Sequence, residues 1–158
     1  YSPGSMMLDR EKSGMNDDQK TGGSCLCGAV KFVVDGPLRK ISYCHCGQCQ
    51  KSSGHYFAAT AAARSDFTLT EDRGLKWFKS SPWAERGFCG DCGCSLFWRM
   101  EGDDNISILA GSFDVDVPLT AEAHIFVKGR KGYYDITDGL PQFDTYPGDP
   151  KNSEGDGK

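Results

Sequence analysis

The sequence predicts an all-β fold, a compact sandwich or barrel of short antiparallel strands. Apolar and polar residues alternate over short stretches, and turn signals rich in glycine, aspartate and proline separate these stretches. No window carries an apolar stripe at helical spacing over several turns. The length of 158 residues suits one domain of this kind.

The first predicted strand starts at Ala29, places Val30, Phe32 and Val34 on one face, and ends at the turn signal of residues 35–37. The same period-2 alternation between turn signals predicts the strands that follow. They are Arg39–His45, Tyr56–Ala62, Asp66–Thr70, Leu75–Lys79, Glu85–Phe88, Ser95–Met100, Ile106–Gly111, Ala123–Val127 and Lys131–Ile136.

The segments between these strands predict the remaining elements. The polar, glycine-containing segments Glu71–Gly74 and Glu101–Asp104 are typical of hairpin connections. Only Gly47–Ser53 has the length and composition for a short helical turn. Residues 1–20 and 148–158 are polar, charged and poor in large apolar side chains, so we expect two disordered tails, the first with an appended tag, around a folded domain of residues 21–147.

Charge and hydropathy argue against two classes of partner. The formal net charge is −4 and the chain has no run of lysine or arginine, which disfavours a nucleic-acid-binding surface. No apolar stretch approaches the roughly 20 residues that cross a bilayer, and the N-terminus lacks a secretory signal. We therefore expect a cytoplasmic protein that binds neither nucleic acid nor membrane.

The eight cysteines fall into three clusters. They are Cys25-x-Cys27, Cys44-x-Cys46-x-x-Cys49 and Cys89-x-x-Cys92-x-Cys94. On a strand, residues i and i+2 project from the same face, so each C-x-C pair can aim two thiolates at one point. In a reducing compartment such clusters are more typical of metal binding than of disulfides.

Zinc suits these ligands because it is borderline soft, redox-inert and tetrahedral with sulfur. Four thiolates close a structural site, whereas three leave one position for water or a substrate. The grouping that we favour has a closed cluster of Cys25, Cys27, Cys89 and Cys92 and an open cluster of Cys44, Cys46 and Cys49, with two Zn²⁺ per chain. Spacing alone also allows Cys94 to replace Cys92 or to complete the triplet.

Three stretches carry a family resemblance: residues 23–30 (GSCLCGAV), 43–51 (YCHCGQCQK) and 86–93 (RGFCGDCG). A weaker match follows in residues 124–126 (HIF) and 138–143 (DGLPQF). Together they resemble the glutathione-dependent formaldehyde-activating enzyme family, whose domain is shared with centromere protein V. The resemblance implies an all-β zinc fold with a structural zinc on the closed cluster and a catalytic zinc on the open cluster.

The resemblance also implies a carbon-sulfur lyase that joins glutathione to formaldehyde, giving S-hydroxymethylglutathione, or that catalyses the reverse. Its partners would be a small-molecule thiol and an aldehyde, and its reactive zinc would be held by Cys44, Cys46 and Cys49. Two alternatives remain open from the sequence. One is a family enzyme that acts on another small substrate, and the other is a non-enzymatic, zinc-stabilised binding module.

Glutathione carries two carboxylates, so a site for it requires cationic side chains near the open cluster. Arg39, Lys51 and Arg86 are the candidates because they lie near cysteines in the sequence, although each also fits an ordinary surface charge.

Three histidines and one spare thiol complete the candidates. His45 lies between two proposed ligands, so on a strand its ring points to the opposite face, where packing or a hydrogen bond to the ligand shell is expected. His55 follows the predicted helical turn as a possible substrate contact, and His124 fits either strand packing or acid-base chemistry. Cys94 is left over and is expected to be a spare thiol.

Overall fold

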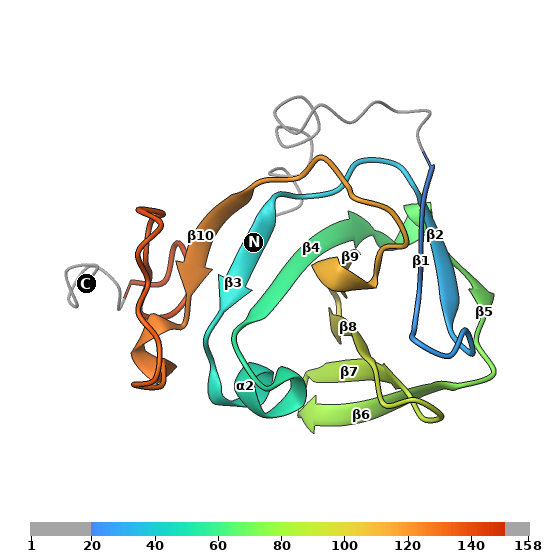
Figure 1. The fold of residues 1–158 in the computed structure, drawn as a ribbon, viewed down its shortest axis with the longest axis horizontal. Helices are drawn as coiled ribbons and strands as arrows, with labels where there is room; N and C mark the ends of the chain where they lie inside the picture. Colours follow the sequence, from blue (N-terminus) through green and yellow to red (C-terminus); the bar gives the residue numbers. More distant parts are fainter. Residues whose placement is uncertain (1–19, 151–158) are drawn as a thin grey trace.

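The computed structural model describes residues 20–150, which form two β-sheets and one short α-helix (Figure 1). The strands are β1 Lys20–Ser24, β2 Lys31–Asp35, β3 Ile41–Cys44, β4 Phe57–Ala63, β5 Phe67–Glu71, β6 Leu75–Ser81, β7 Ala84–Cys89, β8 Ser95–Met100, β9 Asn105–Leu109 and β10 Ala121–Ile125. The helix is α2 Gly47–Ser53, and the 3₁₀ turns are η1 Arg64–Asp66, η2 Ala110–Ser112 and η3 Val127–Gly129. Most of the two predicted tails, residues 1–19 and 151–158, lies outside the described residues.

The predicted all-β class is confirmed. The larger sheet has the strand order β10-β3-β4-β9-β8-β7-β6 and the smaller sheet has the order β1-β2-β5. All pairs are antiparallel except β10 with β3, which run parallel and pair Ile125 with Cys44. The prediction of antiparallel strands throughout was therefore wrong at this edge, because β10 reaches β3 after a long connection from β9 rather than through a hairpin.

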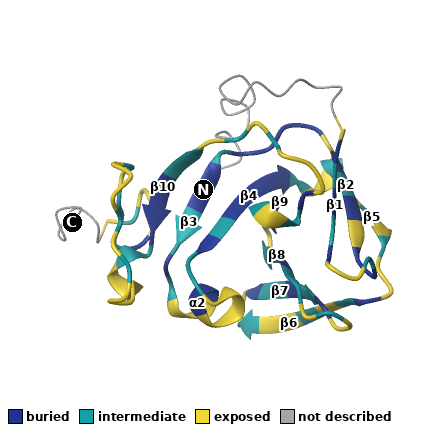
Figure 2. Ribbon diagram, viewed as in Figure 1, coloured by how far each residue is buried: buried dark blue, intermediate teal, exposed yellow. Residues whose placement is uncertain are grey.

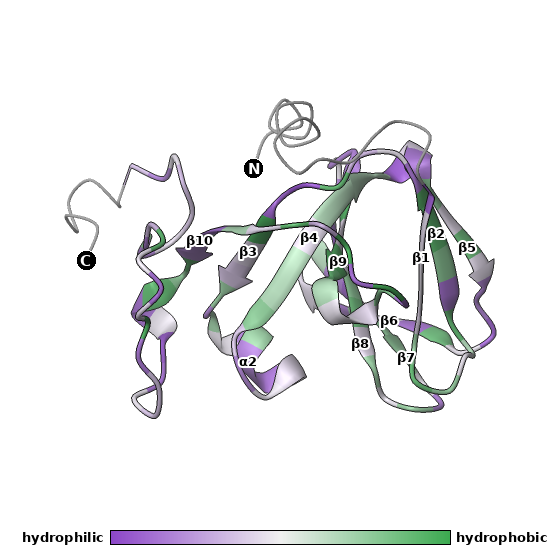
Figure 3. Cartoon of the chain, turned by 45° about the horizontal axis from the view of Figure 1, so that its top comes forward, coloured by the Kyte–Doolittle hydropathy of each residue, from purple (hydrophilic) through white to green (hydrophobic). Residues whose placement is uncertain are grey.

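The main core lies between the two sheets, where the dark blue of Figure 2 marks the buried residues. Phe32 of β2 is 1% exposed, and its ring packs edge-on against Phe97 of β8 at 5.3 Å between centroids. Strand β4 (FAATAAA) is apolar along almost its whole length, pale green in Figure 3, and its residues are buried on both faces. This is the pattern of a strand in the middle of a sheet.

The structure differs from the prediction in three places. Residues 131–136 form no strand, and β1 was not predicted because its sequence, KTGGS, contains no large apolar side chain. Residues 71–74 connect β5 of the smaller sheet to β6 of the larger one, so they are not a hairpin. The connection of residues 101–104 does join the antiparallel pair β8 and β9, and α2 spans the predicted Gly47–Ser53.

The last part of the described chain covers the outer edge of the larger sheet. In Figure 1 the orange and red segment after β10 lies beside β10, on the far side of the molecule from the smaller sheet. The amide of His124 donates to the carbonyl of Pro141, and the amide of Phe143 donates to the carbonyl of His124, each at 2.9 Å. These two bonds flank Gln142 and hold this segment against β10. Among residues 20–150, no helix has both the length and the apolar character needed to cross a membrane.

Candidate metal centre

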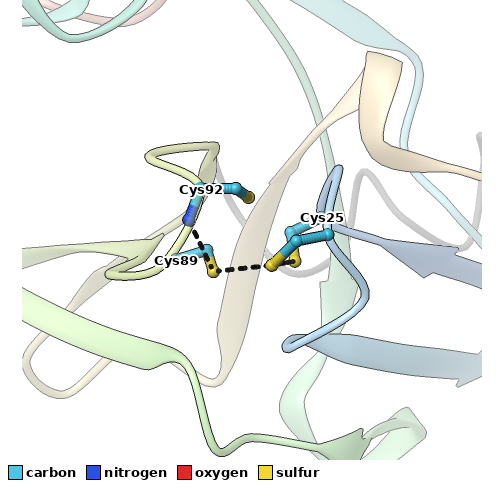
Figure 4. A group of neighbouring side chains, drawn as sticks. Cys25, Cys89 and Cys92 are labelled. Carbon is cyan, nitrogen blue, oxygen red and sulfur yellow. Dashed lines mark hydrogen bonds between the residues drawn. The ribbon is translucent and has the colours of Figure 1, made fainter.

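The closed cluster gathers four sulfurs from segments that are far apart in the sequence. The Sγ atoms of Cys25, Cys27, Cys89 and Cys92 all lie within 4.8 Å of one another. Cys25 and Cys27 come from the turn after β1, and Cys89 and Cys92 come from the end of β7 and the turn that follows, as Figure 4 shows for three of them. The cluster therefore joins the smaller sheet to the larger one.

The donor geometry of the closed cluster fits a tetrahedral metal ion. The Sγ of Cys27 lies 3.7 Å from both the Sγ of Cys25 and the Sγ of Cys89. Zinc–sulfur bonds of about 2.3 Å at tetrahedral angles separate sulfurs by about 3.8 Å. All eight cysteines are free rather than paired in disulfides, so the sulfurs are available as ligands.

Backbone amides support these sulfurs. The amide of Val30 donates to Cys25 Sγ at 3.2 Å, and the amide of Cys92 donates to Cys89 Sγ at 3.5 Å. Burial raises the pKa of Cys25, but the Val30 amide and bonds with the neighbouring thiols more than offset it, so that the pKa is lowered. The backbone at Gly74 also lies close to this cluster, since a Cβ on Gly74 would lie 2.9 Å from Cys89 Sγ.

The open cluster consists of three sulfurs on a strand end and a short helix. The Sγ atoms of Cys44, Cys46 and Cys49 lie within 4.8 Å of one another. Cys44 ends β3, and Cys46 is the N-cap of α2, its Sγ accepting a hydrogen bond from the amide of Cys49 at 3.3 Å. The helix ends at Gly54, whose φ of +85° suits glycine. A strand followed at once by a capped helix thus turns all three sulfurs toward one point.

The thiols of the open cluster have different pKa values. Hydrogen bonds with Cys44 and Cys49 hold the pKa of Cys46 far below the usual value of a thiol, whereas the bond with Cys46 raises the pKa of Cys44. The charge of Arg86 also lowers the pKa of Cys46. The open cluster therefore contains a thiolate, which is the form that binds a metal ion.

Arg86 of β7 is the cationic candidate that the structure brings to the open cluster. Its Nη2 donates to Cys49 Sγ at 3.5 Å and to Gln48 Oε1 at 3.2 Å, and its guanidinium lies over the Phe57 ring at 5.6 Å. Gln48 is held in turn through its Nε2, which donates to the carbonyl of Ser80 at 3.0 Å. Within the described residues, the buried Nε of Arg86 has no hydrogen-bond partner.

Two cavities flank this arrangement, and Phe57 and Ser95 line both of them. A cavity of about 240 Å³ is lined by Arg86 together with aromatic side chains that include Phe78. A larger one of about 510 Å³ extends toward Cys25 and Cys94. Arg86 therefore faces both a sulfur of the open cluster and a space that a small molecule can occupy.

The other two cationic candidates lie elsewhere. Arg39 is 5% exposed, and its Nη2 donates to the carbonyl of Ala59 at 3.1 Å, so its charge supports the backbone. Lys51 lies on the exposed side of α2. Cys94 belongs to neither cluster, and its Sγ accepts a hydrogen bond from the amide of Leu26 at 3.2 Å.

His45 and His124 contact each other behind the open cluster. His45 Nε2 lies 2.8 Å from His124 Nδ1, and both rings are buried. Burial, followed by the charge interaction with His124, lowers the pKa of His45 to about 4, so this ring is neutral near pH 7. His55 lies apart from them, with its Nδ1 3.1 Å from the hydroxyl of Tyr133.

Four residues of this region were not singled out from the sequence. Phe57 and Tyr134 were placed only in the predicted strands Tyr56–Ala62 and Lys131–Ile136, and Gln50 and Asp138 were read only as parts of the family match. The i+4 spacing of Gln50 from Cys46 places it on the helix beside the open cluster, which is a usable signal. The positions of Tyr134 and Asp138 depend on long-range folding and leave no local signal.

Comparison with known proteins gives a consistent set of relatives. A family profile described as "Glutathione-dependent formaldehyde-activating enzyme" matches residues 20–129. An "uncharacterized lyase" of Schizosaccharomyces pombe is 28% identical over 124 residues, covering 77% of this chain and 88% of the relative. A Halomonas elongata protein named "Putative glutathione-dependent formaldehyde-activating enzyme" is 26% identical over 129 residues, covering 72% of this chain and 79% of that protein. The crystal structure of a Rhodobacter sphaeroides protein shares the fold, with a TM-score of 0.51 at 22% identity over 61% of this chain and 91% of that one.

Proposed function

The chain belongs to the glutathione-dependent formaldehyde-activating enzyme family, and from this membership and the open cluster we propose that it is a zinc-dependent carbon-sulfur lyase. It adds a thiol, glutathione, to a small aldehyde such as formaldehyde, or catalyses the reverse cleavage. The names of two relatives, a lyase and a formaldehyde-activating enzyme, support this class of reaction. The observation that carries the proposal is a three-sulfur cluster contacted by the Arg86 cation, which also lines a small cavity.

Cys44, Cys46 and Cys49 would hold the reactive zinc, and the closed cluster would hold a structural zinc. A zinc ion with three thiolate ligands supplies Lewis acidity at its remaining coordination position, which favours a deprotonated thiol or polarises a carbonyl oxygen. The four sulfurs of the closed cluster saturate a tetrahedral ion, so we assign no chemistry to it.

The reaction joins two small molecules without an oxidant or a reductant. A carbon-sulfur bond forms between the thiol sulfur and the aldehyde carbon, the carbonyl π bond breaks, and the proton of the thiol is transferred to the carbonyl oxygen. In the reverse direction the same bonds are exchanged and the free thiol and aldehyde are released.

Arg86 has two tasks in this proposal. Its guanidinium stabilises the negative charge on Cys49 Sγ, which it contacts at 3.5 Å. It also lines the cavity of about 240 Å³ with donor capacity left over, because both of its hydrogen bonds use Nη2. A carboxylate of the thiol substrate is the group that suits this donor.

The test of the proposed function follows the adduct directly. Proton NMR of formaldehyde and glutathione, with and without the protein, measures how fast free formaldehyde exchanges with S-hydroxymethylglutathione. We expect the purified protein with two zinc ions to accelerate this exchange, and Cys44→Ser to lose the acceleration together with one zinc ion. Added zinc should restore activity to metal-stripped wild type and leave Cys44→Ser inactive.

Two results would contradict the proposal. One is undiminished acceleration by Cys44→Ser after the second metal is gone. The other is a wild-type protein that carries both metals but does not accelerate adduct formation for any combination of thiol and aldehyde. That result would instead support a zinc-stabilised binding module.

A further inference from the structure

A hydrogen-bond chain centred on the buried rings of His45 and His124 lies beside the open cluster. We propose that His45, together with Tyr134 and Gln50, forms a positioning network that holds the backbone between Cys44 and Cys46 in the arrangement that binds metal. The inference rests on the proposed function only in treating the open cluster as a metal site, and it assigns a role to residues outside the ligand set.

The chain runs through four side chains. Asp138 Oδ2 lies 2.8 Å from His124 Nε2, and because a carboxylate only accepts, His124 Nε2 carries the proton. His124 Nδ1 lies 2.8 Å from His45 Nε2, and His45 Nδ1 lies 2.5 Å from the hydroxyl of Tyr134. Every nitrogen of the two rings has a hydrogen-bond partner, so the orientation of His45 is fixed.

Gln50 fixes the backbone of the same residue. Its Nε2 donates to the carbonyl of His45 at 2.6 Å and to the carbonyl of Gly129 at 2.7 Å. The two segments are so close that a Cβ on Gly129 would lie 2.9 Å from the carbonyl oxygen of His45. The amide of His45 donates to the carbonyl of Ile125 at 2.9 Å.

The amide, carbonyl and both ring nitrogens of His45 are thus all bonded, and every partner except Gln50 comes from the segment after residue 120. His45 stands between Cys44 and Cys46, so this network sets the direction in which both sulfurs project. Partners in the outer shell of a metal site typically change metal affinity or activity by about 10–100-fold when they are removed. Strand β10 and the segment after it therefore act on the open cluster without contributing a ligand.

The experiment measures metal affinity at each cluster in the absence of substrate. Tyr134→Phe removes one hydroxyl from the ring stack, and Gln50→Met removes both amide donors at similar side-chain length. Competition with a chromophoric zinc chelator gives the two affinities, and cadmium-113 NMR reports each cluster as a separate resonance. We expect either variant to weaken zinc binding at the open cluster by about 10–100-fold and to shift only its cadmium resonance.

Tyr133→Phe is the matched control because Tyr133 is 63% exposed and, among residues 20–150, its hydroxyl pairs with His55 rather than with His45. It should retain both affinities and both resonances. Wild-type affinity at the open cluster in Tyr134→Phe and Gln50→Met would overturn the inference, and so would equal weakening of both clusters with a lower melting temperature. Failure of the wild type to form the thiol adduct would refute the proposed function and leave this result unaffected.

Discussion

In the proposed function, Arg86 would connect the chemistry of the open cluster with the recognition of a substrate. Three thiolates on a divalent ion leave a net charge of about −1, and a guanidinium at 3.5 Å from one of the sulfurs offsets that charge. The guanidinium lies over the aromatic ring of Phe57, and both side chains line the cavity of about 240 Å³. One side chain can therefore stabilise the metal site and bind an anionic substrate.

Arg86→Gln tests this role in recognition. Hydrogen bonds to charged groups contribute about 1.5–3 kcal/mol, which corresponds to roughly 10–100-fold in binding. We expect the KM for glutathione to rise by about that factor and the KM for 2-mercaptoethanol, which has no carboxylate, to change much less. Steady-state kinetics by NMR with both thiols gives the comparison, and metal analysis should still find two ions.

The control for Arg86→Gln is Arg73→Gln. Arg73 is a surface arginine that pairs with Glu71 at 3.0 Å, and neither cavity includes it among its lining residues. Its substitution should leave the preference for glutathione unchanged. The role of Arg86 would be ruled out if its variant kept the wild-type preference between the two thiols.

The sequence could identify the cationic candidates but could not rank them. Arg86 lies three residues before Cys89, yet its guanidinium contacts Cys49, which is 37 residues away. That contact depends on how β7 and α2 lie in the folded chain, and spacing carries no information on it. The grouping of the cysteines was more accessible, because their short spacing already brings sulfurs together. The strand geometry assumed for the C-x-C pairs was wrong, since Cys25 and Cys27 lie in the turn after β1 and Cys46 is the N-cap of α2.

At the scale of elements, β1 shows what local sequence patterns miss. It contains two glycines and no large apolar residue, so its strand character comes from its neighbours: it pairs with β2 on one side, and Gly23 bridges to Phe113 on the other. The opposite error occurred at residues 131–136, whose aromatic residues resemble a strand but pack beside His55 and Tyr56 instead. In both cases, whether the segment forms a strand depends on pairing partners that are distant in the sequence.

Gly23→Ala and Gly22→Ala separate close packing from strand propensity. A Cβ on Gly23 would lie 2.2 Å from Phe32 Cζ and 2.7 Å from the carbonyl oxygen of Ser112, whereas a Cβ on Gly22 meets nothing closer than 3.7 Å. Phe32 is fixed in the core, so Gly23→Ala should lower the free energy of unfolding by about 1–3 kcal/mol. Gly22→Ala should change it far less.

Denaturant unfolding followed by tryptophan fluorescence measures this difference. The two variants differ by one position and add the same methyl group, so each controls for the other. Equal unfolding midpoints would show that β1 is not packed against Phe32 and Ser112 as described.

At the scale of the whole molecule, the closed cluster links the two sheets through cysteine side chains. Cys25 and Cys27 follow β1 of the smaller sheet, while Cys89 and Cys92 lie at the end of β7 in the larger one. The open cluster lies instead within the larger sheet and its attached helix. A metal ion at the closed cluster would therefore stabilise the arrangement of the sheets, and one at the open cluster would not.

Cys89→Ser and Cys49→Ser distinguish these two contributions. Structural zinc contributes an apparent binding free energy of about 10–16 kcal/mol to folding, which is comparable to or larger than the net stability of a domain of this size. We expect Cys89→Ser to be insoluble or unfolded, because loss of the zinc ion from the closed cluster would remove the link between the two sheets. We expect Cys49→Ser to remain folded with one zinc ion and no activity. Circular dichroism melts and metal analysis of the soluble fractions measure both outcomes. Identical melting curves for the two variants would contradict this division, since they would mean that the fold depends on both clusters alike or on neither.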